Sequence, residues 1–256
     1  MFSWWGTGRW ALMRTETELG HVFRLQAQKL GGHLVAYGIF FTVIALGVIV
    51  GFSFLVSSPS AGNEMLYLAT GAPTIVLVMT ALVVVPMQNA TARVAGYIDF
   101  IKSLPVSRKN FLFADCTVWL LITVPAIVIA VVTAHFMFHP GFSVSWTIIP
   151  AYVLVVTACF GIGYGYSYAM PAELAMGLSQ IIAFVALMFT PISFPMDRLP
   201  EWLQVVHLAL PLHHMAQVMR ASLAHGTFQA GIVSYVVLAV WSVLGFFAAI
   251  RILERD

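Results

Sequence analysis

Six long apolar runs, separated by short polar or charged stretches, dominate the hydrophobic pattern of the chain. Each run reaches the ~20 residues that a helix needs to cross the hydrocarbon core of a bilayer. None of them contains Asp, Glu, Lys or Arg. The pattern therefore predicts an all-α integral membrane protein with six transmembrane helices. The expected spans are Leu34–Val56, Met65–Met87, Cys116–Phe138, Val144–Met170, Leu174–Phe194 and Gln229–Ile250.

Residues 1–32 precede the first run and carry a different pattern. Apolar residues, among them Leu19, Phe23 and Leu30, recur there at helical spacing, while four basic residues interrupt them. Such a helix lies on a membrane surface with its apolar face in the headgroup layer. We expect a cytoplasmic amphipathic interface helix over residues 1–32, followed by a transmembrane domain over residues 33–256.

A charged and polar stretch, residues 93–109, separates the second run from the third. Within it Tyr97, Ile101 and Leu104 fall on one face of a short helix. Pro105 ends that helix, because the residue before a proline avoids the α region. An amphipathic helix between two spans is typical of a docking element for a soluble partner. An ordinary solvated loop fits the same pattern, so the pattern alone leaves both interpretations open.

The stretch between the fifth and sixth runs, residues 195–228, is too charged to span a membrane and too apolar to be a free loop. It opens with the charged residues Asp197, Arg198 and Glu201, and apolar residues fill most of the remainder. We expect short re-entrant helices that dip into the outer leaflet. Pro200 and Pro211 should stand at or near their first turns, where a missing N–H costs least.

Composition agrees with a lipid environment, because 61% of the residues are apolar and only 9% are charged, against roughly 25% charged residues in soluble domains. A net charge of +2 is too small to indicate nucleic-acid binding. The placement of Lys and Arg is more informative. Ten lie in residues 1–32, residues 93–109 and the C-terminal end, and two lie in residues 195–228. The positive-inside rule then predicts that both termini and the 93–109 loop face the cytoplasm.

The chain lacks the motifs of an energy-converting or catalytic protein. No P-loop motif occurs, so ATP should bind to another chain. No acidic or basic side chain is expected inside a span, apart from His135 near the end of the third run. An intramembrane protease is a weak alternative, since the Gly-x-Ser nucleophile motif of the rhomboid type and the paired Glu and His of the metal-dependent type are missing from the runs. A non-transporting scaffold or sensor subunit would share the same hydropathy.

Several other residue sets have a functional and an ordinary interpretation. The pairs Gly47–Gly51 and Gly161–Gly165 allow close helix contact, either within the chain or between subunits. The tyrosines of the fourth run either line a pathway or mark the membrane interface. Cys116 and Cys159 fall inside or at the edge of apolar runs and are interpreted as small buried residues. No metal site is expected from the histidines of residues 195–228, since adjacent side chains on a helix point about 100° apart. These histidines are His207, His213, His214 and His225.

The chain resembles the membrane subunits of ABC-2 type exporters, the group that includes daunorubicin-resistance and nodulation-factor permeases. Three features carry the resemblance. The first is an amphipathic N-terminal helix before six spans. The second is the loop Gly96-Tyr-Ile-Asp99-Phe-Ile-Lys-Ser-Leu104-Pro105-Val-Ser-Arg108. The third is the proline pattern of Pro191-Ile-Ser-Phe-Pro195, Leu199-Pro200-Glu-Trp202-Leu203 and Leu210-Pro211-Leu212-His213, followed by Arg220. The chain departs from the family where Tyr97 follows the loop glycine in place of Thr, and where Leu210 replaces an Asn.

The resemblance implies a permease half-transporter in the cytoplasmic (inner) membrane of a prokaryote. Two permease subunits, identical or paralogous, would pair, and separate ATP-binding subunits would hold ATP and Mg²⁺ and dock on the loop. No cofactor is expected in this chain. The implied coupling residues are Gly96, Tyr97, Asp99, Phe100, Ile101, Lys102, Leu104, Pro105 and Arg108. The implied external gate comprises Pro195, Pro200, Trp202, Pro211 and Arg220. The apolar spans favour a lipophilic or amphiphilic substrate.

Overall fold

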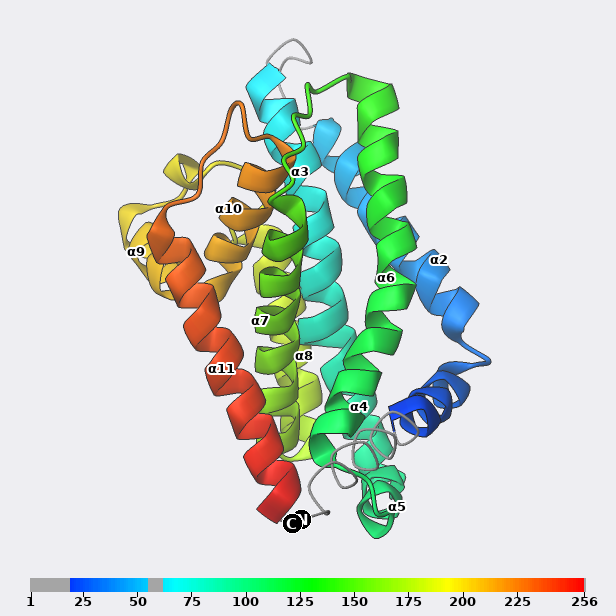
Figure 1. Ribbon diagram of the computed structural model, residues 1–256. Coiled ribbons are helices and arrows are strands. Elements are labelled where there is room, and N and C mark those ends of the chain that lie inside the picture. Colours follow the sequence, from blue (N-terminus) through cyan, green and yellow to red (C-terminus); the bar gives the residue numbers. More distant parts are fainter. Residues whose placement is uncertain (1–18, 55–61, 256) are drawn as a thin grey trace, which may run out of the picture.

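The computed structural model of the chain describes residues 19–54 and 62–255. Long helices run side by side through the molecule, and short helices lie at its two ends (Figure 1). Within the described ranges no strand forms, and the single β-bridge joins Ser143 to Ala224. The prediction of an all-α integral membrane protein is confirmed.

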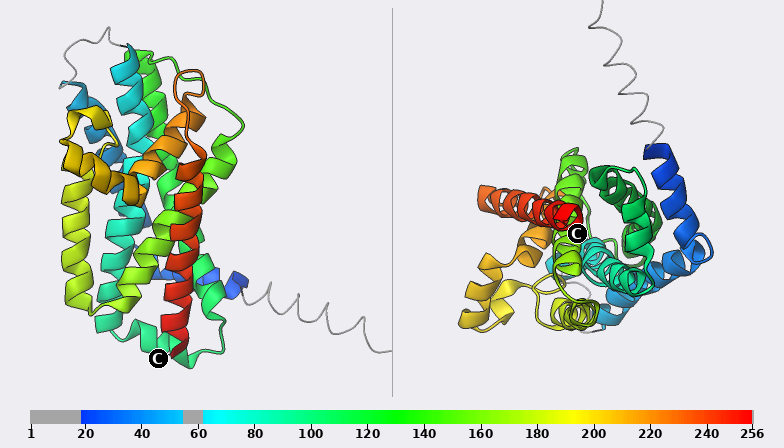
Figure 2. Two further views of the ribbon diagram at one scale, coloured as in Figure 1. Left: turned by 90° about the vertical axis from the view of Figure 1, so that its left-hand side faces the viewer. Right: turned by 90° about the horizontal axis from the view of Figure 1, so that it is seen from below.

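The first helix covers residues 19–30, and residues 1–18 of the expected interface helix lie outside the described residues. This helix lies across the direction of the long helices, beside α5 (Figures 1 and 2). The remaining helices, in chain order, are α2 (Leu34–Ser53), α3 (Gly62–Met79), the π-helix η1 (Thr80–Val84), α4 (Val85–Val94), α5 (Tyr97–Ser103), α6 (Arg108–Phe138), α7 (Ile148–Ala169), α8 (Ala172–Met188), the 3₁₀-helix η2 (Met196–Arg198), α9 (Glu201–Ala209), α10 (Pro211–Leu223) and α11 (Ile232–Arg255).

Five helical stretches in the described chain are long and apolar enough to cross a membrane: Leu34–Ser53, Glu64–Val94, Arg108–Phe138, Ile148–Ala169 and Ile232–Glu254. The expected fifth span corresponds to α8, which is apolar but has only 17 residues. That length is the lower limit for a helix that crosses a bilayer, roughly 17–25 residues. The structure therefore gives five full-length spans and one short candidate.

Helix α6 begins at Arg108, well before the expected start of the third span at Cys116. The added residues form about two helical turns, and they bring Asp115 into the span. The expectation that no acidic side chain lies inside a span is therefore wrong. A hydropathy pattern ends at the first charged residue, whereas a helix continues for as long as its backbone hydrogen bonds do.

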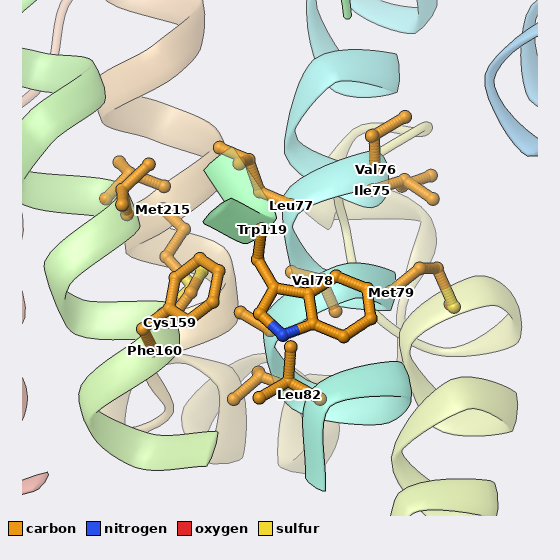
Figure 3. Packing of buried hydrophobic residues seen from close by; sticks show 14 of the residues in the cluster. Ile75, Val76, Leu77, Val78, Met79, Leu82, Trp119, Cys159, Phe160 and Met215 are labelled. Atoms are coloured by element: carbon orange, nitrogen blue, oxygen red, sulfur yellow. The ribbon is translucent and has the colours of Figure 1, made fainter. Parts of the chain in front are cut away.

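The continuous helix α3–η1–α4 is the buried centre of the bundle. Trp119 of α6 is buried against Leu77, Val78 and Leu82 of this helix, as Figure 3 shows from close by. Cys159 lies elsewhere in the same core with its sulfur 3.3 Å from the sulfur of Met215. Both cysteines are buried and free, as the sequence predicted.

The π-helix η1 interrupts this central helix where α7 crosses it. A π-turn leaves a backbone carbonyl without its usual helical partner, and Tyr166 Oη donates to the carbonyl of Leu82 at 2.6 Å. Gly163 lies against the carbonyl of Ala81, where a Cβ atom would collide with backbone. The close approach of α7 to η1 therefore requires glycine at this position.

The two glycine pairs singled out in the sequence have different surroundings. Gly161 and Gly165 lie against α11, where Gly245 of α11 faces Gly161 so closely that a Cβ atom on it would collide with backbone. They mediate packing within the chain. Gly47 and Gly51 are exposed on α2, and a Cβ atom on either would meet nothing within 4 Å. The surface around this second pair has no partner among the described residues.

Candidate functional site

The short helix α5 is held in a fixed loop between α4 and α6. Gly96 joins it to α4 with a φ of +74°, a left-handed conformation that glycine adopts at little cost. The residue before Pro105 is extended, so the proline ends the helix as predicted. Arg108 then closes the loop, because its Nη1 and Nη2 donate to the carbonyls of Ile101 and Lys102 at 3.0 and 3.1 Å.

Arg93, upstream of the loop glycine, has a partner within the chain. Its Nη1 donates to the carbonyls of Ser167 and Met170 at 3.0 and 2.7 Å. These carbonyls belong to the C-terminal end of α7, where a cation satisfies groups that the helix leaves without partners. Arg93 thus fixes the end of α4 to the end of α7.

The inner face of α5 packs against the chain itself. Ile98 and Ile101 are buried, with 7% and 4% of their surface exposed. Ile101 and Leu104 line a small apolar cavity of about 90 Å³ together with Val22 and Leu25 of the first helix. Ile101 is one of the coupling residues that the resemblance implies, and its side chain is covered by this chain itself. The sequence predicted an amphipathic helix but could not say what would cover its apolar face.

The outer face of α5 is open. Asp99, Phe100, Ser103 and Pro105 are exposed, and Phe100 leaves 49% of its surface uncovered. Asp99 also borders a polar cleft of about 190 Å³ between α5 and the end of α11. An exposed aromatic ring of this kind is typical of surfaces that contact another protein.

Tyr97 connects α5 to the first helix. Its hydroxyl donates to Gln26 Oε1 at 3.4 Å, and Lys29 Nζ lies 4.6 Å from the centre of its ring. Burial and, to a smaller extent, the charge of Asp115 raise the pKa of Tyr97 to about 12. The Tyr97 hydroxyl therefore stays protonated at neutral pH. This position, where the chain departs from the family pattern, makes a contact inside the molecule.

The segment 195–228 forms a module at the opposite end of the molecule from α5 (Figure 2). Pro200 is the N-cap of α9, and Pro211 is in the first turn of α10. The prediction of short helices that begin at these two prolines is confirmed. Pro195 likewise stands at the N-cap of η2.

The two helices of this 195–228 module have different environments. Helix α9 exposes large apolar side chains, with Trp202 at 68% exposure, whereas nearly every residue of α10 is buried. The charged residues Asp197, Arg198 and Glu201 are exposed, and Arg198 pairs with Glu64 at 2.5 Å. Helix α10 is therefore part of the core, while α9 presents an apolar surface of the kind that lipid covers.

Arg220 is the buried cation of α10, with 3% of its surface exposed. Its Nη2 donates to the carbonyl of Ile192 at 2.8 Å, and its guanidinium carbon lies 3.3 Å from the centre of the Tyr67 ring and 5.6 Å from that of Phe228. Burial lowers its pKa to about 10, so it stays charged at neutral pH. Arg220 thus ties α10 to α3 and to the segment that follows α8.

Two histidines of the 195–228 module, His207 and His214, make polar contacts within the protein. His214 Nδ1 and Nε2 lie 3.0 and 2.9 Å from Ser234 Oγ and the carbonyl of Leu208, and His207 Nε2 lies 2.9 Å from the carbonyl of Phe189. Among the described residues no group of His, Cys, Asp or Glu could hold a metal ion. These histidines pack and anchor α9 and α10.

A comparison with protein-family models matches residues 24–224 to the ABC-2 type transporter family. The match covers more than three quarters of the chain, from the first described helix to the end of α10. The chain belongs to this family. It is thus the membrane permease subunit of an ABC transporter. Members of this family pair with an ATP-binding subunit. No curated protein matches the chain closely enough to be reported as a relative.

Among the described residues of the permease, one buried acidic residue lies directly before the apolar run of the expected third span. Asp115 of α6 is 2% exposed, and Tyr164 of α7 donates to its Oδ2 at 2.7 Å. The sequence holds one signal for it, a carboxylate directly before an apolar run, but its partner lies 49 positions away. The tyrosines Tyr164 and Tyr166 of the permease make contacts inside the chain, with Asp115 and η1, and so they form no interfacial belt.

Proposed function

We propose that this permease is half of an ATP-driven exporter, and that an ATP-binding subunit docks on the outer face of α5. The observation that supports this proposal is the contrast between the two faces of α5. Ile101 is covered, so the loop has a fixed shape, while Phe100 and Asp99 are uncovered. A rigid, short helix with an exposed aromatic side chain is suited to transmit force between two proteins.

The α5 end of the molecule faces the cytoplasm in this proposal. Eight of the ten Lys and Arg residues in the described parts of the chain belong to segments at that end, and Arg198 and Arg220 belong to the opposite end. An excess of this kind marks the cytoplasmic side of a membrane protein. With this orientation both termini lie in the cytoplasm. We further propose that the membrane is the inner membrane of a prokaryote and that ATP and Mg²⁺ bind to the partner subunit beneath α5.

The second half of the exporter is another copy of this chain or a paralogous permease. Helix α2 supports such pairing, because Val35, Ile39, Val43, Gly47 and Gly51 form an exposed stripe at four-residue spacing. Small residues on such a stripe let helix backbones approach closely in a membrane. The pair would enclose the transport path, with the 195–228 module as its external gate.

The exported substrate is lipophilic or amphiphilic in this proposal. Most of the surface along the spans is apolar, and in the described spans the buried acid Asp115 lies near the cytoplasmic end. Little fixed charge is thus available to hold a strongly ionic solute. A scaffold or sensor subunit that transports nothing would have the same helices, but it would not need an ATP-binding partner on α5.

The test is the affinity between the purified permease and its ATP-binding subunit. Phe100→Ala removes an exposed ring from the docking face and should weaken the complex by about 1–3 kcal/mol, roughly 5- to 150-fold in Kd. Asp99→Lys reverses a charge on the same face and should weaken the complex as well. Phe136→Ala is the matched control, because this ring is 72% exposed near the other end of α6. Equal affinities for all four proteins would eliminate docking at α5.

A further inference from the structure

A groove on the surface of the bundle has no part in the proposed docking or pairing of the permease. It has a volume of about 590 Å³ and is formed by α6, α7 and α11, while α2 and α5 do not line it. Helix α7 packs closely along α11, whereas α6 meets α11 at few positions (Figure 1). Phe113 of α6 and Val153 of α7 line the groove and are 62% and 55% exposed. The groove therefore opens on the outside of the spans.

The walls of the groove are apolar over most of its length. Side chains that form these walls include Leu112, Cys116, Leu120, Val156 and Phe246. Thr117 and Thr157 also line it, and their hydroxyls donate to carbonyls of their own helices at 2.7 and 2.9 Å. Such walls offer few groups to a polar solute, and burial of apolar surface favours a hydrocarbon chain in the groove.

The end of the groove nearest α5 is cationic. Lys109 and Asn110, in the first turn of α6, line it there. Arg108, which precedes them, is used within the chain, because it donates to the carbonyls of Ile101 and Lys102. Lys109 is exposed and forms no ion pair within the described ranges. Its ammonium group is therefore available to an anion at the mouth of the groove.

The length of α6 sets the depth of these groups in a membrane. The helix has 31 residues, which gives a length of roughly 46 Å, whereas the hydrocarbon core of a bilayer is about 30 Å thick. The first turn, with Lys109, therefore reaches the headgroup layer. Leu120, the groove residue of α6 farthest from Lys109, lies roughly 16 Å further along the helix axis, inside the hydrocarbon of the same leaflet. A cation at headgroup depth and an apolar groove beside it match the two parts of a phospholipid.

We propose that this groove binds an anionic phospholipid, with an acyl chain between α6 and α7 and the phosphate at Lys109. Cationic pockets between membrane helices bind the headgroups of acidic lipids, and each Lys or Arg near the membrane surface strengthens such binding. The charge of Lys109 favours an anionic headgroup over a zwitterionic one, while the apolar walls bind the acyl chains of both. This inference goes beyond the proposed function and depends on neither the ATP-binding partner nor the exported substrate.

The first test measures lipid binding to the purified permease in a neutral detergent by native mass spectrometry. The probes are phosphatidylglycerol, which is anionic, and phosphatidylcholine with the same acyl chains, which is zwitterionic. Phosphatidylglycerol should bind the wild type more tightly than phosphatidylcholine does. Lys109→Gln should weaken the binding of phosphatidylglycerol about fivefold, and Lys109→Arg should bind it as the wild type does. Equal affinities of the wild type for the two lipids would overturn the proposal.

Arg24→Gln is the matched control for charge. Arg24 is exposed on the first helix, at the same end of the molecule as Lys109, and it does not line the groove. This variant should keep the wild-type affinity for phosphatidylglycerol. Equal losses in Arg24→Gln and Lys109→Gln would mean that the net charge of this end attracts the lipid and that the groove does not select it, which would overturn the proposal.

The second test fills the groove. Val153→Phe adds a ring to its wall and should lower the affinity for both lipids roughly tenfold, the effect of about two methylene groups that are no longer buried. Val236→Phe is the matched control, because Val236 is also 55% exposed but lies near the start of α11, outside the groove. Equal lipid binding by the two variants would overturn the proposal.

The same spectra report the oligomeric state of the permease, and so they test a second copy of the chain as the occupant of the groove. With lipid in the groove, Val153→Phe and Val236→Phe should show the same oligomeric state as the wild type. A wild-type dimer that is lost in Val153→Phe and kept in Val236→Phe would assign the groove to a second copy and overturn the proposal.

Discussion

At the scale of single residues, three arginines of the permease share one arrangement. Arg93 and Arg108 donate to carbonyls at the C-terminal ends of α7 and α5, and Arg220 donates to the carbonyl of Ile192, just past α8. Helix ends leave carbonyls without partners, and a guanidinium group has several donors in one plane. These arginines therefore fix the relative positions of helices. Arg108, which the sequence placed among the coupling residues, has this structural contact as its observed role.

Replacing Arg220 by Lys should show how much the planar group matters. Lysine keeps the charge but loses the stacking on Tyr67 and the geometry of the hydrogen bond to Ile192. We expect a loss of stability of about 2–3 kcal/mol, because a buried charge would be left poorly satisfied. The measurement is thermal unfolding of the purified protein in one detergent.

The control for this prediction is Arg198→Lys. Arg198 is 52% exposed in its pair with Glu64, and exposed ion pairs contribute little, about 0–1 kcal/mol. Its melting temperature should change much less than that of Arg220→Lys. Equal shifts in melting temperature would show that the buried stacking of Arg220 adds no more stability than an exposed ion pair.

At the scale of helices, local signals in the sequence predicted where elements begin and end. Pro105, Pro200 and Pro211 act on their own backbone, so the end of α5 and the starts of α9 and α10 followed from them. The faces that the helices bury could not be predicted in the same way. Ile101 is covered by the first helix, and Asp115 by Tyr164 of another span. Both contacts join segments that are distant in sequence, and a single sequence does not state which segments meet.

Glycines of the spans allow a prediction at this scale. Gly163→Ala places a methyl group against the carbonyl of Ala81 in η1, so α7 and η1 must separate at a cost of about 1–3 kcal/mol. Gly177→Ala in α8 meets nothing within 4 Å and should be neutral, or stabilising by up to ~1 kcal/mol. Thermal unfolding of the two variants at one detergent concentration makes the comparison. A Gly163→Ala protein as stable as Gly177→Ala would refute the close packing of α7 on η1.

At the scale of the whole molecule, the two ends of the bundle differ in chemistry. The α5 end combines most of the basic residues in the described chain, the open outer face of α5 and the buried Asp115–Tyr164 hydrogen bond. The opposite end has the buried helix α10 and the exposed apolar surface of α9. Under the proposed function, force from an ATP-binding subunit would enter at α5, and the 195–228 module would respond at the far side.

The last prediction is the membrane orientation on which that direction depends. Ser103 on α5 and Thr227 beyond α10 are both exposed in the folded chain, so a cysteine at either position can react with a maleimide. Cys116 and Cys159 are buried, and replacing both by Ala gives a background without reactive thiols. In intact cells a membrane-impermeant maleimide should label the cysteine at 227 and not the one at 103, because the basic α5 end stays in the cytoplasm. After lysis both should react. Labelling at 103 in intact cells would show that the permease has the opposite orientation, with α5 out of reach of any cytoplasmic ATP-binding subunit.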